Sequence, residues 1–433
     1  MMIDLLPKLM HGYLFFSASQ RWSAERIGDY QDLKLRTLVR HAAKQVPYYR
    51  QLFKEIGFDP AAFRGREDMH RIPLLDKEMV RTRAQELIAG NARRFGIIWE
   101  STSGSTGTPL HIIVDRGARA GKLATLVRAY QWGGYRFWMK TFSLQSYYLK
   151  NGFYETKPLF RVLRYDSNQF KRETAIEVIK LLQREEPQFF MGFPFDLLVF
   201  SRFAAEADLK IPSPKAMVVY GETLSDQKRA SLEKAYNCEV YNYYSQHECA
   251  SMIAECEEHS LHLVDDFAYH EFVHTDGSDA SKAGRGELVG TNLYNYAMPL
   301  IRYRTRDDVT FDPEQKPCAC GRRFTTVSEI VGKQCDYIET PDGRYLGAVM
   351  SHSIDNGQGV VVSQCVQDTI DHLTVNLVVD GSFTKASETA LERDLRKRLG
   401  QEMQIDFRIV PQLEKRPGGK TPFILSKIGH KYA

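Results

Sequence analysis

The sequence predicts an α/β protein with a large N-terminal domain of mixed sheets and helices and a small, mobile C-terminal α+β domain. Strand-like and helix-like segments alternate between residues 96 and 244, which favours sheets covered by helices over an all-helical bundle. After residue 330 the pattern becomes strand, helix and strand, over a length that is ordinary for a separate domain. We therefore expect domains over residues 1–331 and 332–433, with a short joint that would permit closure over a ligand.

Each expected element follows from local periodicity and from the residues that interrupt it. Helices come first, over residues 24–60, with a break at Pro47 and an end at Gly57. The other expected elements are strands at 96–99, 110–114, 215–220, 239–244, 373–379 and 404–410, and helices at 116–130, 172–184, 225–236 and 386–399.

The bulk composition excludes several classes of protein. Of the 433 residues, 43% are hydrophobic, which is enough for a large core, and the net charge of +4 is mild. No long Lys/Arg run appears, so we expect no nucleic-acid partner. The chain also lacks the run of about 18 apolar residues that a transmembrane helix needs. The seven cysteines, an odd number in so long a chain, do not indicate a disulfide framework.

The apolar N-terminal stretch, residues 1–16, is interrupted by Asp4, Pro7 and Lys8. It lacks the basic start and the small-residue cleavage site of a signal peptide. We interpret it as a helix packed on its own domain, with a weak membrane-surface association as the alternative.

Since no targeting signal is recognised, the expected location is the cytoplasm. The sequence leaves the oligomeric state open.

A loop rich in glycine and hydroxyl side chains lies between two expected strands. It contains Thr102, Ser103, Gly104, Ser105, Thr106, Gly107 and Thr108. The glycines let the backbone approach an anion closely, and the hydroxyl groups can donate to phosphate oxygens. No lysine follows as in GxxxxGK[ST], so a lysine for the phosphates must come from elsewhere. Taken alone, the stretch is as typical of a flexible loop as of a phosphate loop.

Two further motifs follow expected strands. Gly221-Glu222 comes after the strand at 215–220, and Tyr244-Ser245-Gln-His-Glu248 ends the next strand. Ligand sites in α/β sheets lie beyond the carboxyl ends of strands, so both motifs are well placed. An aromatic ring such as that of Tyr244 can lie against an adenine, and a carboxylate such as that of Glu248 can hold Mg²⁺.

The last two motifs contain an acid and a lysine. Asp307 ends the segment Arg302-Tyr-Arg-Thr-Arg-Asp307, and its paired oxygens can accept hydrogen bonds from both hydroxyls of a ribose. Lys420 ends Arg416-Pro-Gly-Gly-Lys420, a loop by its proline and glycines. Such a loop can bring a lysine against a negatively charged transition state. Standing alone, each residue would be interpreted as an ordinary surface charge.

This ordered set of motifs resembles the phenylacetate–CoA ligase family of adenylate-forming, AMP-binding enzymes, and within it the CapK-like members tied to capsular polysaccharide synthesis. The stretches Ile72-Pro-Leu-Leu-Asp-Lys77, Gly192-Phe-Pro194 and Gly286-Glu-Leu-Val289 share the resemblance. It spans nearly the whole chain, and the colinear order makes it specific although each motif alone is weak. The resemblance implies a large ATP- and acid-binding domain and a small lid domain that carries Lys420.

The resemblance also implies a role for each matched residue. The loop at 102–108 would cradle the ATP phosphates, and Gly221, Glu222 and Tyr244 would border the adenine, with Ser245 also among the nucleotide-binding residues. Asp307 would hold the ribose, and Glu248 would bind Mg²⁺. Lys420 would contact the carboxylate and the α-phosphate. We include Lys333 among the nucleotide-binding residues. The family usually carries an arginine at this position in the joint, and a lysine does not reproduce the planar fork of an arginine. Cys335 stands at the hinge position. The segment that would line a CoA tunnel also departs from the CoA ligases.

A second constellation has the composition of a metal site. Cys256, His262, Cys318 and Cys320 offer three thiolates and an imidazole, a set that satisfies tetrahedral Zn²⁺. His259 is an alternative to His262 as the fourth ligand. Relatives in the family carry a similar set, so the resemblance supports a structural zinc, and four protein ligands leave no open position for catalysis. The alternative is a group of reduced surface cysteines.

The leading hypothesis for function is activation of a carboxylic acid to an acyl-adenylate, with ATP and Mg²⁺ consumed and pyrophosphate released. Acyl transfer to CoA, or to an amine or sugar acceptor, would follow, with capsular or exopolysaccharide biosynthesis as the setting. One alternative is an adenylyltransferase that leaves AMP on a hydroxyl of a small molecule, as some relatives do with a deazaflavin. The other is a non-catalytic scaffold in polysaccharide assembly. The sequence identifies neither the acid nor the acceptor.

Overall fold

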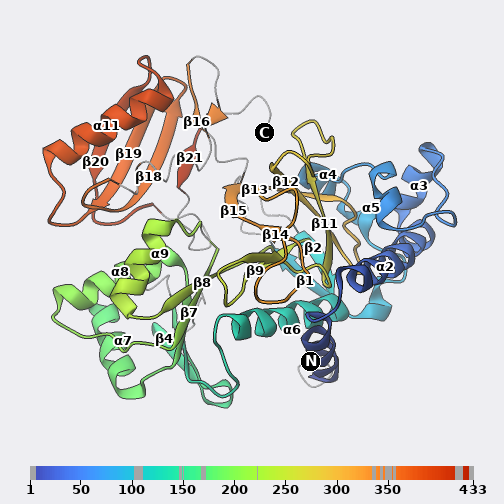
Figure 1. Ribbon diagram of the computed structural model, residues 1–433, viewed down its shortest axis with the longest axis horizontal. Coiled ribbons are helices and arrows are strands. Elements are labelled where there is room, and N and C mark those ends of the chain that lie inside the picture. Colours follow the sequence, from blue (N-terminus) through green and yellow to red (C-terminus); the bar gives the residue numbers. More distant parts are fainter. Residues whose placement is uncertain are drawn as a thin grey trace. The chain divides into compact units, whose positions relative to one another are not determined.

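The computed structural model describes residues 6–101, 111–145, 149, 151–166, 172–221, 223–333, 338–341, 345–346, 354, 357–414 and 423–428. The chain forms two compact units, each assembled from two stretches of sequence. The first unit contains Met1–Gly134 and Tyr243–Ile330, and the second contains Tyr135–Asn242 and Val331–Ala433. The mixed sheets and helices, with a smaller C-terminal α+β part, confirm the predicted fold class (Figure 1). The domain boundary placed at residue 332 stays a prediction.

The first unit begins with helices. They are α1 (Leu6–Ser19), α2 (Ala24–Gln45), α3 (Pro47–Glu55), α4 (Lys77–Thr82), α5 (Ala84–Leu87) and α6 (Arg116–Trp132), with the 3₁₀ turns η1 (Arg66–Arg71) and η2 (Ala92–Phe95). Ser23 caps α2 by accepting from the backbone of Arg26, and Pro47 starts α3, as the predicted break requires. In α1, Phe16 is buried whereas Met10 and Leu14 are exposed, so one face of this helix packs on its own unit.

The strands of the first unit form three groups. They are the antiparallel pair β1 (Ile97–Ser101) and β2 (His111–Asp115); the run β8 (Glu239–Ser245), β9 (Met252–Glu255), β10 (Leu261–Leu263) and β14 (Thr326–Val327); and the sheet β11 (Ala268–Val273), β12 (Arg285–Asn292), β13 (Tyr303–Thr310) and β15 (Glu329–Lys333). A shared core that includes Ile253, Leu288 and Val309 fills the space between the last two groups. The chain crosses between the units inside β8 and again inside β15.

The second unit contains a mainly parallel sheet with strand order β7-β6-β3-β5-β4. Its strands are β3 (Thr141–Gln145), β4 (Tyr154–Lys157), β5 (Val162–Asp166), β6 (Phe189–Gly192) and β7 (Ala216–Tyr220), and its helices are α7 (Arg172–Glu185), α8 (Pro194–Glu206) and α9 (Asp226–Tyr236), with the 3₁₀ turn η3 (Pro158–Phe160). Only β4, at the edge, is antiparallel to its neighbour. This arrangement confirms the expected helices at 172–184 and 225–236 and the expected strand at 215–220.

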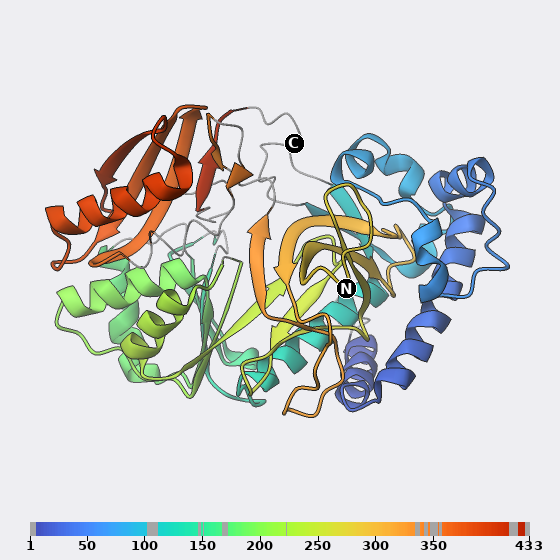
Figure 2. The same ribbon diagram turned by 45° about the horizontal axis from the view of Figure 1, so that its top comes forward.

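The C-terminal part of the second unit has its own sheet and core. The elements are β16 (Ile338–Glu339), β17 (Tyr345–Leu346), β18 (Val360–Thr369), β19 (His372–Val379), α11 (Lys385–Leu399), β20 (Gln404–Ile409) and β21 (Ile424–Ser426). The sheet order is β20-β19-β18-β21, and α11 covers one face of it (Figure 2). The strands and the helix expected at 373–379, 386–399 and 404–410 are confirmed, whereas β18 was not expected.

Candidate active site

The β1–β2 hairpin carries the hydroxyl-rich loop. The two strands pair from Ile97↔Asp115 to Ser101↔His111, so the loop connects their adjacent ends. Residues 102–110 lie outside the described residues, and the phosphate-binding role of 102–108 stays a prediction. Asp115 ends β2 and caps α6, because its side chain accepts from the backbone N–H of Ala118 at 2.9 Å. The hairpin and α6 therefore form one continuous support for the loop.

A charged network that the sequence did not predict lies near the loop end of this hairpin. Arg119 Nη1 donates to Glu100 Oε1 at 2.6 Å, and His247 Nδ1 lies 3.7 Å from Glu100 Oε2. The neighbouring imidazole of His247, with help from the cations Arg119 and Lys122, holds the pKa of Glu100 below its ordinary value. Lys122 Nζ donates to the backbone carbonyl of Gln246 at 2.7 Å. The network ties β1 and α6 to the segment that contains the predicted Tyr244 and Glu248.

Tyr244 and Asp307, which are 63 positions apart in the sequence, are in direct contact. Tyr244 Oη donates to Asp307 Oδ2 at 2.6 Å, and Gln246 Nε2 donates to the same oxygen at 3.1 Å. Gln246 Nε2 also lies 2.7 Å from Tyr244 Oη, which closes a triangle of three side chains. Burial, reinforced by the charge of Asp307, raises the pKa of Tyr244 well above its ordinary value, so the phenol stays a donor.

Glu248 is held by a second tyrosine. Tyr303 Oη donates to Glu248 Oε1 at 3.0 Å, and burial keeps the pKa of Tyr303 well above its ordinary value. Tyr303 and Asp307 are both buried residues of β13, at positions whose side chains share one face of the strand. One strand face thus contributes Asp307 and the residue that holds Glu248. The structure brings Tyr244, Glu248 and Asp307 into one linked cluster.

The other predicted nucleotide-binding residues are distributed as follows. Ser245 is the last residue of β8 and pairs with Met252 of β9. Gly221 follows β7 in the second unit with a φ of +81°, a conformation that favours glycine. Lys333 is the last residue of β15. Glu222 and Lys420, together with the hinge residue Cys335, lie outside the described residues, so their roles stay predictions.

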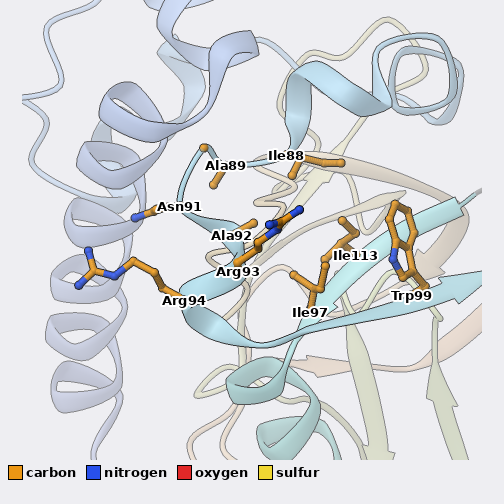
Figure 3. A pocket seen from close by; sticks show the side chains of 10 residues that line it. Ile88, Ala89, Asn91, Ala92, Arg93, Arg94, Ile97, Trp99 and Ile113 are labelled. Carbon is orange, nitrogen blue, oxygen red and sulfur yellow. The ribbon is translucent and has the colours of Figure 1, made fainter.

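A pocket of about 500 Å³ opens beside the β1–β2 hairpin. In Figure 3, Ile97, Trp99 and Ile113 of the hairpin lie opposite Ile88 and Arg93 of the preceding segment. Its described lining contains none of the residues that the motifs predicted. Among the described residues, those that the motifs predicted gather instead in the cluster of polar side chains around Asp307.

The predicted metal ligands converge. The ligand atoms of Cys256, His262, Cys318 and Cys320 all lie within 4.8 Å of one another. Cys256 Sγ is 3.8 Å from Cys318 Sγ, and Cys320 Sγ is 3.4 Å from His262 Nε2. A tetrahedral zinc site with Zn–S bonds of about 2.3 Å would separate two sulfurs by about 3.8 Å and a sulfur and a nitrogen by about 3.5 Å. The donor set and its spacing fit Zn²⁺.

The two candidate histidines behave differently. His262 is buried, and its Nδ1 lies 3.4 Å from the carbonyl of Phe324, which leaves Nε2 directed toward the thiols. Burial lowers the pKa of His262, which favours the neutral imidazole that binds metals. The alternative ligand, His259, instead lies 2.9 Å from Glu255 Oε1.

The fold is that of adenylate-forming ligases. A solved structure of 2-hydroxyisobutyryl-CoA ligase, in the postadenylation state in complex with 2-HIB-AMP, superposes with a TM-score of 0.76 at 18% identity, over 94% of this chain and 91% of that chain. At such low identity the likeness shows the fold, and together with the sequence relatives it confirms the predicted class of enzyme, an adenylate-forming ligase.

The sequence relatives are more particular. The chain is 23% identical over 411 residues to protein CapK of Staphylococcus aureus, covering 92% of this chain and 89% of that protein. It is 23% identical over 393 residues to phenylacetate-coenzyme A ligase of Thermus thermophilus, covering 88% and 85%. Residues 338–427 match the family described as the CapK C-terminal domain. These matches confirm the resemblance that the motifs indicated. In the described part of the chain, no helix combines the length and apolar character of a membrane span.

Proposed function

We propose that the protein activates a carboxylic acid with ATP and Mg²⁺. A carboxylate oxygen of the acid attacks the α-phosphorus of ATP, the bond from that phosphorus to the bridging oxygen breaks, and pyrophosphate leaves with the released electron pair. The product is an acyl-adenylate. The observation that carries this proposal is the linked cluster of Tyr244, Glu248 and Asp307 beside the hairpin that bears the hydroxyl-rich loop.

The cluster supports distinct roles for its two acids. Asp307 is fixed by Tyr244 and Gln246, so its carboxylate is orientated before a ribose arrives and little ordering remains to be done on binding. Glu248 is orientated by Tyr303 and would be a ligand of the Mg²⁺ that neutralises phosphate charge. Arg119 and Lys122 add positive charge near the start of the loop at 102–108, which suits a polyphosphate.

The remaining predicted residues complete the proposal. Gly221, Glu222 and Tyr244 would border the adenine, and Ser245 and Lys333 would be further nucleotide-binding residues. Lys420 would stabilise the charge that develops at the α-phosphate. The relatives named as CoA ligases support CoA as the acyl acceptor. An amine or sugar acceptor in capsular or exopolysaccharide biosynthesis is the other candidate, as the CapK-like resemblance of the motifs implies.

We also propose that Cys256, His262, Cys318 and Cys320 hold a structural zinc. The convergence of the four ligand atoms supports this assignment. A zinc bound by four protein ligands supplies no open position, so its contribution would be to the stability of the β9–β10 region and the segment that contains Cys318.

The test of the ligase proposal is acid-dependent release of pyrophosphate from MgATP. A panel of aryl, fatty, hydroxy and amino acids is assayed with and without CoA, for the unchanged protein and for Lys420→Ala and Glu248→Gln. Glu314→Gln is the matched control, because Glu314 is 77% exposed. We expect one acid class to be needed and each site variant to lower the rate by about a hundredfold or more.

Other outcomes lead to other functions. A stable adenylated product formed without any acid would replace the proposal with adenylyl transfer to a hydroxyl. ATP binding without pyrophosphate release or adenylated product, unaltered by Lys420→Ala, would support the scaffold hypothesis instead.

A further inference from the structure

The second unit exposes four large apolar side chains in two neighbouring turns. Phe137 is 50% exposed, Trp138 71%, Leu159 71% and Phe160 56%. We refer to these four residues as the turn patch. Scattered exposed apolar residues are normal, but a local group of large ones marks an interaction surface.

The sheet brings the two turns together. Residues 136–140 precede β3 and residues 158–161 precede β5, and these two strands are parallel neighbours with Thr141 opposite Val162. The turns therefore end side by side at the amino-terminal edge of the sheet. Arg161 Nη1 donates to the carbonyl of Trp138 at 2.7 Å, which joins one turn to the other.

The backbone of the patch adopts conformations that its residues rarely take. Trp138 has a φ of +71° and Arg161 a φ of +52°, both in the left-handed region. A bulky residue with a β-carbon is strained there, and such strain persists where the surrounding structure imposes it and clusters at functional sites. The strained residue Trp138 carries an indole that is mostly exposed rather than packed. Packing therefore does not explain why a tryptophan stands at this position.

The two turns and their flanks carry four cations, two of which are paired with carboxylates. Lys140 pairs with Glu185 at 3.0 Å, and Lys157, the last residue of β4, pairs with Glu155. Arg136 precedes Trp138 by two residues in the sequence, and Arg161 contacts the carbonyl of Trp138. Within the described residues neither arginine makes an ion pair. The surface is thus a group of aromatic and aliphatic side chains with a basic rim formed by Arg136 and Arg161.

We propose that the turn patch docks on the surface of an anionic lipid bilayer. Trp138, Leu159 and Phe160 would enter the boundary between headgroups and acyl chains, where tryptophan is favoured. The basic rim would face lipid phosphates. A second copy of the chain is a poorer occupant, because a two-fold contact would place the same positive rim against itself.

The position of the patch leaves the opposite edge of the sheet accessible. Gln145 and Tyr220, joined by a hydrogen bond of 2.8 Å, lie at the carboxyl ends of β3 and β7. Ligands of α/β sheets bind beyond that edge. Docking through the amino-terminal edge would therefore not cover it, and the proposal does not depend on which acid the protein activates.

The test is flotation of the full chain with vesicles of phosphatidylglycerol and phosphatidylcholine, against vesicles of phosphatidylcholine alone, at low ionic strength. We expect binding to the anionic vesicles and a blue shift of tryptophan emission. Trp138→Gly should weaken binding about tenfold or more, because the inserted side chain is lost. Arg136→Gln should weaken it about fivefold.

Two controls separate binding from folding. Glycine adopts a φ of +71° without strain, so Trp138→Gly should unfold at the same temperature as the unchanged protein or at a higher one. Ile409→Ser removes an apolar side chain that is 62% exposed elsewhere, and it should bind vesicles normally.

Several outcomes would overturn the proposal. They are no binding to anionic vesicles, equal binding to neutral ones, and equal binding by Trp138→Gly. Self-association of the unchanged protein that Trp138→Gly abolishes, without vesicle binding, would assign the patch to a second copy instead. Binding of an acidic protein at the patch in place of vesicles would also refute the lipid assignment.

Discussion

Asp266 and Asp307 are both almost fully buried in the first unit, yet their partners differ in kind. Asp266 is paired with Arg128, which is itself buried, through contacts of 2.6 Å to Oδ2 and 2.9 Å to Oδ1. Ser19 also donates to Asp266, and Arg128 Nη1 donates to the carbonyl of Phe16 at 2.7 Å. Asp307, by contrast, accepts at Oδ2 from the neutral side chains of Tyr244 and Gln246.

The difference separates a structural carboxylate from one that is suited to a ligand. A bidentate arginine compensates the charge of Asp266 and joins α6 to α1. The role of this acid is therefore structural. Tyrosine and glutamine orientate Asp307 without supplying a positive charge, and an orientated carboxylate remains a strong acceptor for hydroxyl groups. Burial alone therefore does not identify a functional acid, whereas the chemistry of its donors does.

The largest effect that this comparison predicts is on stability, at Arg128. Arg128→Met should lower the free energy of unfolding by about 3–5 kcal/mol, because Asp266 would be left as a buried charge without its cation. Denaturant unfolding measures the change. As a control, Arg202→Met removes one side of an exposed pair with Glu206 and should cost no more than about 1 kcal/mol. Equal losses in the two variants would contradict the structural role of the buried pair.

With the proposed zinc, the cysteine–histidine cluster would compensate buried polar groups in a third way. Cys320→Ser should release the zinc and lower the free energy of unfolding by about 3–4 kcal/mol, the linkage expected when zinc is present at several hundred times its dissociation constant. Metal analysis of the purified protein and thermal unfolding with and without a chelator measure both effects. Cys238→Ser, at a half-buried cysteine outside the cluster, should keep the metal. If the purified protein contained no zinc and its unfolding temperature did not respond to the chelator, the four residues would be ordinary reduced cysteines and a histidine.

The local elements could be predicted from the sequence because local patterns determine them. The break at Pro47 and the helix capped by Asp115 follow from proline and from a side-chain cap, and the motifs indicated Tyr244, Glu248 and Asp307. The strand at Val360–Thr369 was missed because its residues are buried in succession along most of its length, so the alternation that marks a half-exposed strand is absent.

The partners of the predicted site residues could not be predicted in the same way. Gln246 and Tyr303 gain their roles from contacts between β13 and the segment that follows β8, and only the fold makes those contacts. One signal was available: Tyr303, Thr305 and Asp307 alternate along β13, so a strand reading of that segment places them on one face. The basic residues Arg119 and Lys122 have no motif of their own, and their place beside the hairpin follows from α6.

Exchanging the two acids for their amides sharpens the comparison between Asp266 and Asp307. Asp307→Asn should raise the KM for ATP by about 10- to 100-fold, because a charge-assisted hydrogen bond to a ribose hydroxyl is weakened, and it should change stability little. Asp266→Asn should do the opposite, with a loss of about 3 kcal/mol of stability and an unchanged KM in the folded protein. Steady-state pyrophosphate release and denaturant unfolding are measured on both. If Asp307→Asn destabilised the protein and left KM unchanged, Asp307 would be a structural acid like Asp266.

The smallest predicted effect is at the donor that orientates Asp307. Tyr244→Phe removes the hydroxyl that donates to Oδ2 at 2.6 Å while keeping the ring, so only the preorganisation of the carboxylate is lost. A hydrogen bond of this kind contributes about 1 kcal/mol, which corresponds to a rise of about fivefold in the KM for ATP. The double variant with Asp307→Asn should show less than the product of the two separate effects, because the tyrosine would act through the acid. Fully multiplicative effects would mean that Tyr244 contacts the nucleotide independently of Asp307, as its ring would if it lay against the adenine.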